Sequence, residues 1–150
     1  MEAHPERYGA DVRFRIQRGL AMTPAEHAAG LAWRGRLRRA LDEILAGHDV
    51  VLLPTTAVLR KPIGEDQVPT EAGPMGYRRA LSVFTAPVNH AGHPALALPL
   101  ACPPAFPNEP PPSLQVIARS GGEARLLEIG LALEAAGIVA FRLPAGVELP

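Results

Sequence analysis

Residues 84–100 restrict the fold of this chain more than any other stretch, because they join a stiff segment to a short apolar one. They read FTAPVNHAGHPALALPL. The prolines and the glycine in residues 84–94 restrict the backbone at several points, so this half predicts an irregular loop. Residues 95–100 are apolar and predict a buried strand. A stiff loop that leads into a buried strand is a suitable wall for a pocket.

Two further segments predict strands. Residues 49–54 (DVVLLP) are apolar without alternation, which is typical of a strand buried on both faces at the centre of an α/β sheet. Residues 113–118 predict another strand, paired beside residues 95–100. Thr55 and Thr56 follow the first strand at its carboxyl end, where open α/β sheets commonly place ligands.

The clearest local signal is the start of a helix at Thr23. Thr23 offers an N-cap hydroxyl, Pro24 fits the first helical position, and Glu26 completes a capping box. We expect this helix to reach about Ala46 and to pack through one apolar stripe, formed by Trp33, Leu37, Leu41, Ile44 and Leu45. Other helices are predicted at residues 8–20 and 123–136 and a short one within 75–83, with loops at 57–74 and 102–112 and an irregular tail or edge strand at 138–150.

Arginines cluster on the long predicted helix, at positions 34, 36, 38 and 39. Arg38 and Arg39 stand four residues before Asp42 and Glu43, a spacing at which ion pairs form along a helix. No aromatic side chains alternate with these arginines, so a solvated helix face is favoured over a nucleic-acid site.

Composition narrows the class of protein further. Lys plus Arg and Asp plus Glu number 15 each, so no net charge favours nucleic acid as a partner. The single cysteine, Cys102, excludes an internal disulfide and fits a reducing compartment. No apolar run approaches the ~20 residues of a membrane span, and the first residues lack the apolar core of a signal peptide. We therefore expect one domain, residues 1–150, in the cytoplasm and without a membrane partner.

Residues 84–99 carry a family pattern, F-T-x-P-x-N-x-x-G-x-P-A-L-x-L-P, which begins at Phe84 and ends at Pro99. With residues 8–20, 49–56 and 114–134, which agree in the same order, it resembles the C-terminal part of the amidase-signature hydrolases. The resemblance covers roughly residues 5–136. It implies an α/β fold with a partial mixed sheet of three or four buried strands flanked by helices.

The resemblance also implies a function, the hydrolysis of carbon–nitrogen amide bonds in a small-molecule amide substrate without a cofactor. The family's catalytic serine, cis-peptide serine and lysine precede the matched region, so none is expected in this chain. Lys61 is the sole lysine, and the serines stand at 82, 113 and 120 outside any G-x-S-x-G setting. The chain would supply scaffold and part of the substrate-pocket wall, with candidate wall residues Thr55, Thr56, Ser82, Thr85, Pro87, Asn89 and Gly92.

Departures from the family pattern leave alternatives open. In the tRNA-dependent amidotransferases of this family, an aspartate recognises the glutamine amine. It stands two residues before the F/Y-T pair, where this chain has Ser82. This difference favours an uncharged amide as the substrate.

His90, His93 and Cys102 are too few donors for a metal site, so no metal site is expected. The main alternative is a non-catalytic paralogue that acts as a binding or subunit-completing module. Without the missing N-terminal catalytic region as its partner, the chain is expected to form a homodimer.

Overall fold

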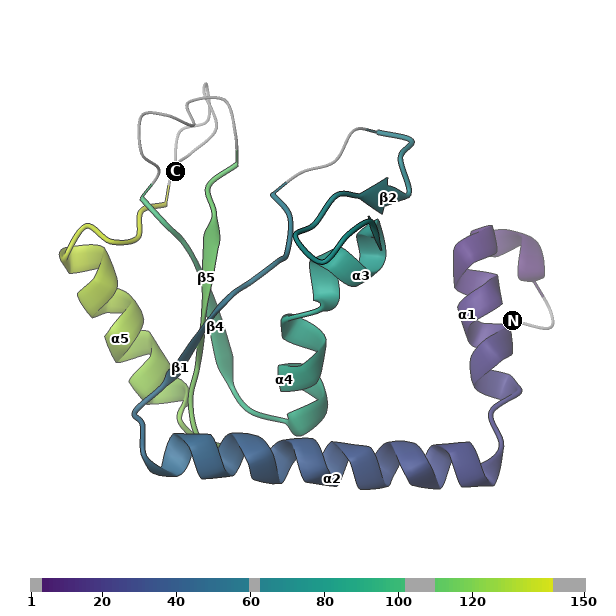
Figure 1. The fold of residues 1–150 in the computed structure, drawn as a ribbon, viewed down its shortest axis with the longest axis horizontal. Helices are drawn as coiled ribbons and strands as arrows, with labels where there is room; N and C mark the ends of the chain where they lie inside the picture. The colour runs from purple at the N-terminus through teal and green to yellow at the C-terminus, as the bar shows by residue number, and fades with distance from the viewer. Residues whose placement is uncertain (1–3, 60–62, 102–109, 142–150) are drawn as a thin grey trace. The chain divides into compact units, whose positions relative to one another are not determined.

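The computed structural model describes residues 4–59, 63–101 and 110–141. The chain divides into two compact units, Met1–Arg36 and Leu37–Pro150, and the boundary falls inside the long helix α2 (Pro24–Ala46). Figure 1 shows the helices and strands of both units. None of the described helices is long and apolar enough to cross a membrane.

The first unit contains a 3₁₀ turn (Pro5–Arg7), helix α1 (Ala10–Leu20) and the first turns of α2. The capping box predicted at Thr23 is present. The Thr23 hydroxyl accepts a hydrogen bond from the Glu26 N–H at 3.2 Å, and the Thr23 N–H donates to Glu26 Oε2 at 2.8 Å. This backbone hydrogen bond, with a second one from the Thr23 hydroxyl, lowers the pKa of Glu26. The chain therefore begins α2 at the predicted residue.

The second unit is built on a sheet of three antiparallel strands, β1 (Val51–Pro54), β4 (Ala95–Pro99) and β5 (Ser113–Ile117). The order is β1-β5-β4, so the strand that comes last in the chain lies in the middle. Val51 and Ala95 both lie opposite Ile117, one on each side of it. This confirms the predicted α/β class and the pairing of residues 113–118 beside residues 95–100.

The expectations that residues 49–54 form a central strand and residues 95–100 a buried one were wrong. Val116 and Ile117 of β5 are fully buried, whereas Leu52 of β1 is 55% exposed. The reason is that β5 is bonded on both sides, while β1 and β4 each have one strand partner within this sheet. An unbroken apolar run shows that both faces of a strand are apolar, not that both are covered.

Helix α5 (Glu123–Ala135) covers one face of the sheet, as Figure 1 shows. The core on this side contains Val116, Ala118 and Leu126, with Leu96 and other half-buried apolar side chains packed against it. The predicted helix at residues 123–136 is thereby confirmed.

Helices α3 (Tyr77–Ser82) and α4 (Thr85–Ala91) lie on the opposite side of the sheet (Figure 1). α4 corrects the prediction that residues 84–94 form an irregular loop. Pro87 is its third residue, and a proline in the first helical turn costs no hydrogen bond because the N–H there has no partner within the helix. Gly92 then ends the helix in the left-handed conformation, at a φ of 77°. Proline and glycine therefore delimit a short helix instead of preventing one.

The C-terminal turns of α2 belong to the second unit and are anchored to it by two hydrogen bonds. Asp42 Oδ1 lies 2.9 Å from His93 Nε2, and Arg119 Nε donates to the Leu45 carbonyl at 2.9 Å. Leu45 is fully buried, but Trp33 and Ile44 are 45% and 48% exposed, so the predicted apolar stripe is too wide. Asp42 contacts His93 across the fold, where an ion pair along the helix was expected.

Two further features involve the loop predicted at residues 57–74, the helical turns predicted within 75–83 and the irregular tail or edge strand predicted at 138–150. β2 (Gln67–Val68) and β3 (Met75–Gly76) form a small antiparallel hairpin. Val139 forms an isolated antiparallel bridge with Leu100 at the end of β4, so the tail begins along that edge of the sheet. The remainder of the tail, residues 142–150, and most of the proline-rich connection, residues 102–109, lie outside the described residues.

Candidate functional site

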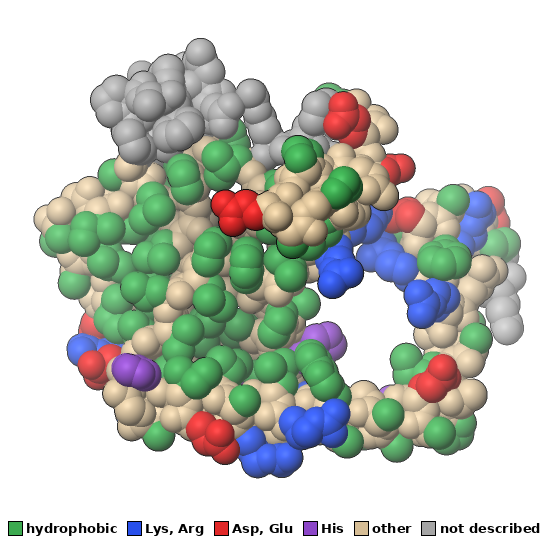
Figure 2. Space-filling view, in the orientation of Figure 1, with side chains coloured by type: hydrophobic (Ala, Val, Ile, Leu, Met, Phe, Trp, Pro, Cys, Tyr) green, Lys and Arg blue, Asp and Glu red, His purple; other side chains and the backbone are tan. Residues whose placement is uncertain are grey.

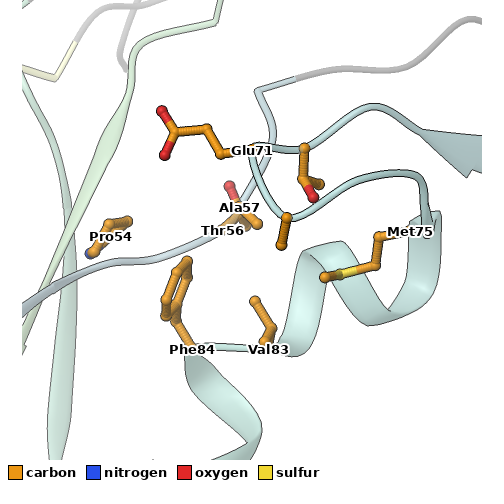
Figure 3. A pocket seen from close by; sticks show the side chains of 9 residues that line it. Pro54, Thr56, Ala57, Glu71, Met75, Val83 and Phe84 are labelled. Atoms are coloured by element: carbon orange, nitrogen blue, oxygen red, sulfur yellow. The ribbon is translucent and has the colours of Figure 1, made fainter.

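A pocket of about 450 Å³ opens in the second unit at the carboxyl end of β1. Its lining comes from three segments: the residues after β1, the turn between β2 and β3, and the junction of α3 with α4. Figure 3 shows Thr56, Met75, Val83 and Phe84 around it. The full lining is Pro54, Thr56, Ala57, Thr70, Glu71, Ala72, Met75, Val83 and Phe84.

Hydrogen bonds to the backbone fix the three segments that form the wall. The Ala57 N–H donates to the Ala80 carbonyl of α3 at 2.9 Å. Gln115 of β5 is buried, and its side-chain Nε2 donates to the Phe84 carbonyl at 3.2 Å. Thr70 and Gly73 exchange backbone hydrogen bonds at 2.9 and 3.2 Å and close the turn between β2 and β3. The pocket is therefore a preformed feature of the second unit.

Of the seven candidate wall residues, Thr56 lines this pocket. Thr55 instead shares a 2.8 Å hydrogen bond with the Ser113 hydroxyl, between the ends of β1 and β5. Ser82 is exposed, and its hydroxyl donates to the Arg78 carbonyl of its own helix at 3.0 Å. Thr85, Pro87, Asn89 and Gly92 belong to α4 or its C-cap and are not among the lining residues.

The turn at residues 70–72 and the side chains of Met75 and Val83 were not anticipated as part of a site. The sequence indicated a loop before residue 75 and helical turns after it. The neighbouring hairpin brings this loop back against the end of β1, and β-pairing between two-residue strands leaves too weak a pattern to read in advance.

The serine and histidine side chains considered in the sequence have the following partners in the described part of the chain. Ser113 is hydrogen-bonded to Thr55, and Ser120 accepts a hydrogen bond from Arg38 at 3.4 Å. No group of three or more His, Cys, Asp or Glu side chains in the described part of the chain is arranged to hold a metal ion. His93 is buried and bonded to Asp42. Lys61 and Cys102 lie outside the described residues.

Comparison with known proteins gives a consistent family signal. A family model described as Amidase matches residues 2–127. The A subunit of the glutamyl-tRNA(Gln) amidotransferase from Thermotoga maritima is 31% identical over 132 residues, which are 85% of this chain and 26% of that protein. The protein of the same name from Streptomyces avermitilis is 32% identical over 148 residues, or 95% of this chain and 28% of that protein.

Solved structures agree with the fold. A crystal structure of an amidase covers 90% of this chain with 35% identity and a TM-score of 0.81, and the match spans 30% of that chain. The chain also matches a structure of a vestigial protein complex that was described as revealing the evolutionary origins of an s-triazine catabolic enzyme. That match has a TM-score of 0.82 at 23% identity. The chain thus spans about a quarter to a third of the length of the proteins that it matches.

Proposed function

Because this chain belongs to the amidase family, we propose that it forms the C-terminal part of an amidase that hydrolyses carbon–nitrogen amide bonds. In this proposal the chain supplies scaffold and part of the substrate-pocket wall. The supporting observation is the pocket at the end of β1, whose lining includes Thr56 and Phe84. Its volume falls within the ~300–1,000 Å³ typical of small-molecule sites, and most of its lining is apolar, as in such sites.

The catalytic groups come, in this proposal, from a segment that precedes the matched region. An activated serine needs a base within hydrogen-bond reach. The three serines of this chain instead bond to Arg78, Thr55 and Arg38. The Arg78 partner is a backbone carbonyl, the Thr55 partner is a hydroxyl and the Arg38 partner is a cation, and none of these is a general base.

Exposed apolar side chains of the second unit support the proposal that another protein segment covers them. On β1, Leu52 is 55% exposed. On α5, Leu127 is 61% exposed and Leu131 is 68% exposed. Figure 2 shows hydrophobic side chains spread over this unit. We refer to Leu52, Leu127 and Leu131 as the uncovered leucines. Because the matched proteins are more than three times longer than their matched part, the N-terminal catalytic region of an amidase is the partner that best accounts for this surface.

The proposal is tested on the purified 150-residue chain in two ways. An aryl amide such as phenylacetamide should not be hydrolysed above background. It should bind, with NMR shift changes concentrated at the backbone amides of Thr56, Ala57 and Phe84, which belong to the pocket. If the chain hydrolyses the amide and loses this activity when any one of its serines is changed, the proposal that the catalytic groups lie in another segment is contradicted.

Two phenylalanine variants provide the matched comparison. Phe84→Ala removes a lining side chain and should weaken the binding of phenylacetamide, while Phe14→Ala should leave it unchanged, because Phe14 lies on α1, outside this pocket. Circular dichroism establishes that both variants are folded. Equal binding by both, or shifts elsewhere on the chain, would favour a binding module unrelated to this pocket.

A further inference from the structure

Both threonine hydroxyl groups in the pocket already donate their protons in hydrogen bonds to backbone carbonyls. Thr56 Oγ1 donates to the Val58 carbonyl at 2.8 Å, and Thr70 Oγ1 donates to the Gly73 carbonyl at 2.6 Å. A threonine hydroxyl has one proton and two lone pairs, so both oxygens remain available only as acceptors. The other lining side chains, apart from Glu71, are those of Pro, Ala, Val, Phe and Met, which contain no N–H or O–H donor.

Among the described lining residues, Glu71 supplies the only charged side chain. It is exposed, and it has no ion-pair partner within the described part of the chain. Figure 3 shows its side chain extending from the turn between β2 and β3, on the side of the pocket where Thr56 and Pro54 lie. A carboxylate is an acceptor only, so the side chains of the pocket present acceptors and a negative charge around an apolar interior.

A ligand suited to this lining brings its own donors and a positive charge. We propose that the pocket takes an amide whose apolar body, aromatic or alkyl, carries a protonated amine that pairs with Glu71. The apolar body contacts Phe84, Met75 and Val83, and the ammonium group donates to the carboxylate at the rim. This inference rests on the proposed role of the pocket as a substrate wall.

The proposal revises the substrate class drawn from Ser82. Serine at that position favoured an uncharged amide, but Ser82 is exposed and its hydroxyl is bonded within α3. Glu71 reaches the pocket from a different element and brings a carboxylate that the motif does not contain. A ligand carboxylate is disfavoured for the same reason, since Glu71 would repel it.

Three probes of similar shape separate charge from size on the intact 150-residue chain: benzylammonium, benzyl alcohol and benzoate. Titrations followed by NMR at the pocket amides should rank benzylammonium first and benzoate last. Because exposed ion pairs are weak, the expected preference of benzylammonium over benzyl alcohol is about two- to five-fold at low salt. High salt should reduce this preference, since it screens an exposed pair.

A matched pair of charge-removing variants assigns the preference to one residue. Glu71→Gln should abolish the preference for benzylammonium while the binding of benzyl alcohol is retained. Glu134→Gln makes the same change of net charge at an exposed position of α5, outside the pocket, and should leave the preference intact. A preference that survives in Glu71→Gln, or equal affinity for the charged and uncharged probes in the parent chain, overturns the inference.

The outcomes also separate this inference from the proposed function. If phenylacetamide binds in the pocket but benzylammonium has no advantage over benzyl alcohol, the cationic substrate class fails and the pocket-wall role stands. If no probe, phenylacetamide included, shifts the pocket amides, the pocket-wall role fails as well.

Discussion

At the scale of single residues, one close packing contact in the second unit occurs at Gly130. A Cβ atom at this position would lie 2.9 Å from Leu96 Cδ2, closer than carbon atoms approach without displacement. Gly130→Ala ought to gain about 1 kcal/mol of helix propensity, but relieving the overlap costs about 1–3 kcal/mol because Leu96 is packed against the core. We therefore expect a net loss of about 1 kcal/mol in the free energy of unfolding, measured by urea denaturation.

Gly30 in α2 is the control for this substitution. A Cβ atom there meets nothing within 4 Å, so Gly30→Ala should raise the free energy of unfolding by up to about 1 kcal/mol through helix propensity alone. If both alanines stabilise the chain, α5 does not pack on β4 as closely as the structure indicates.

At the scale of elements, the order β1-β5-β4 makes the strands energetically unequal. Ile117 of β5 is fully buried, so Ile117→Ala should cost about 2–5 kcal/mol. Leu52 of β1 is 55% exposed, and Leu52→Ala should cost about 0.5 kcal/mol or less. Thermal unfolding of the two variants measures the difference. Equal losses would mean that β1 is a central strand after all.

The sequence predicts the helices and strands of this fold better than it predicts which of them are buried by their neighbours. The Thr23 capping box, the three strands and α5 follow from local chemistry, because caps and apolar runs act over a few residues. Which strand is central depends on pairing between distant segments, and the apolar runs of β1 and β5 do not encode it. α4 was missed because a proline in a first turn and one in a loop look alike in sequence.

The same limit applies to the site. Thr56 was identified because a position after a strand can be read from the sequence. Glu71 and Met75 were not, since their place in the pocket depends on how the hairpin β2–β3 folds back toward β1. Thr55 was identified by the same reasoning, but its hydroxyl bonds to Ser113 instead of lining the pocket. The remaining wall candidates come from the family pattern and its neighbour Ser82, and their positions fall mainly on α4 and its cap.

At the scale of the whole molecule, the uncovered leucines should make the isolated chain self-associate. Exposed apolar surface beyond a few hundred Å² tends to be buried by association, most simply in a symmetric dimer. Sedimentation velocity at increasing protein concentration should show this association. The double variant Leu127→Glu with Leu131→Glu should remain monomeric, whereas Leu20→Glu on α1, at a side chain that is 76% exposed, should still associate. A monomeric parent chain at all concentrations would contradict this prediction.

The position of β5 has a consequence for the time at which the sheet forms. β1 and β4 are each made before β5, and each pairs with β5 and not with the other. During synthesis, neither strand can therefore pair with β5 until residues 113–117 have left the ribosome. Contacts between distant segments form slowly, and strands that wait for a partner are vulnerable to aggregation. The nascent chain is accordingly most exposed to misassembly after β4 has emerged, and a chaperone would protect it best in that interval.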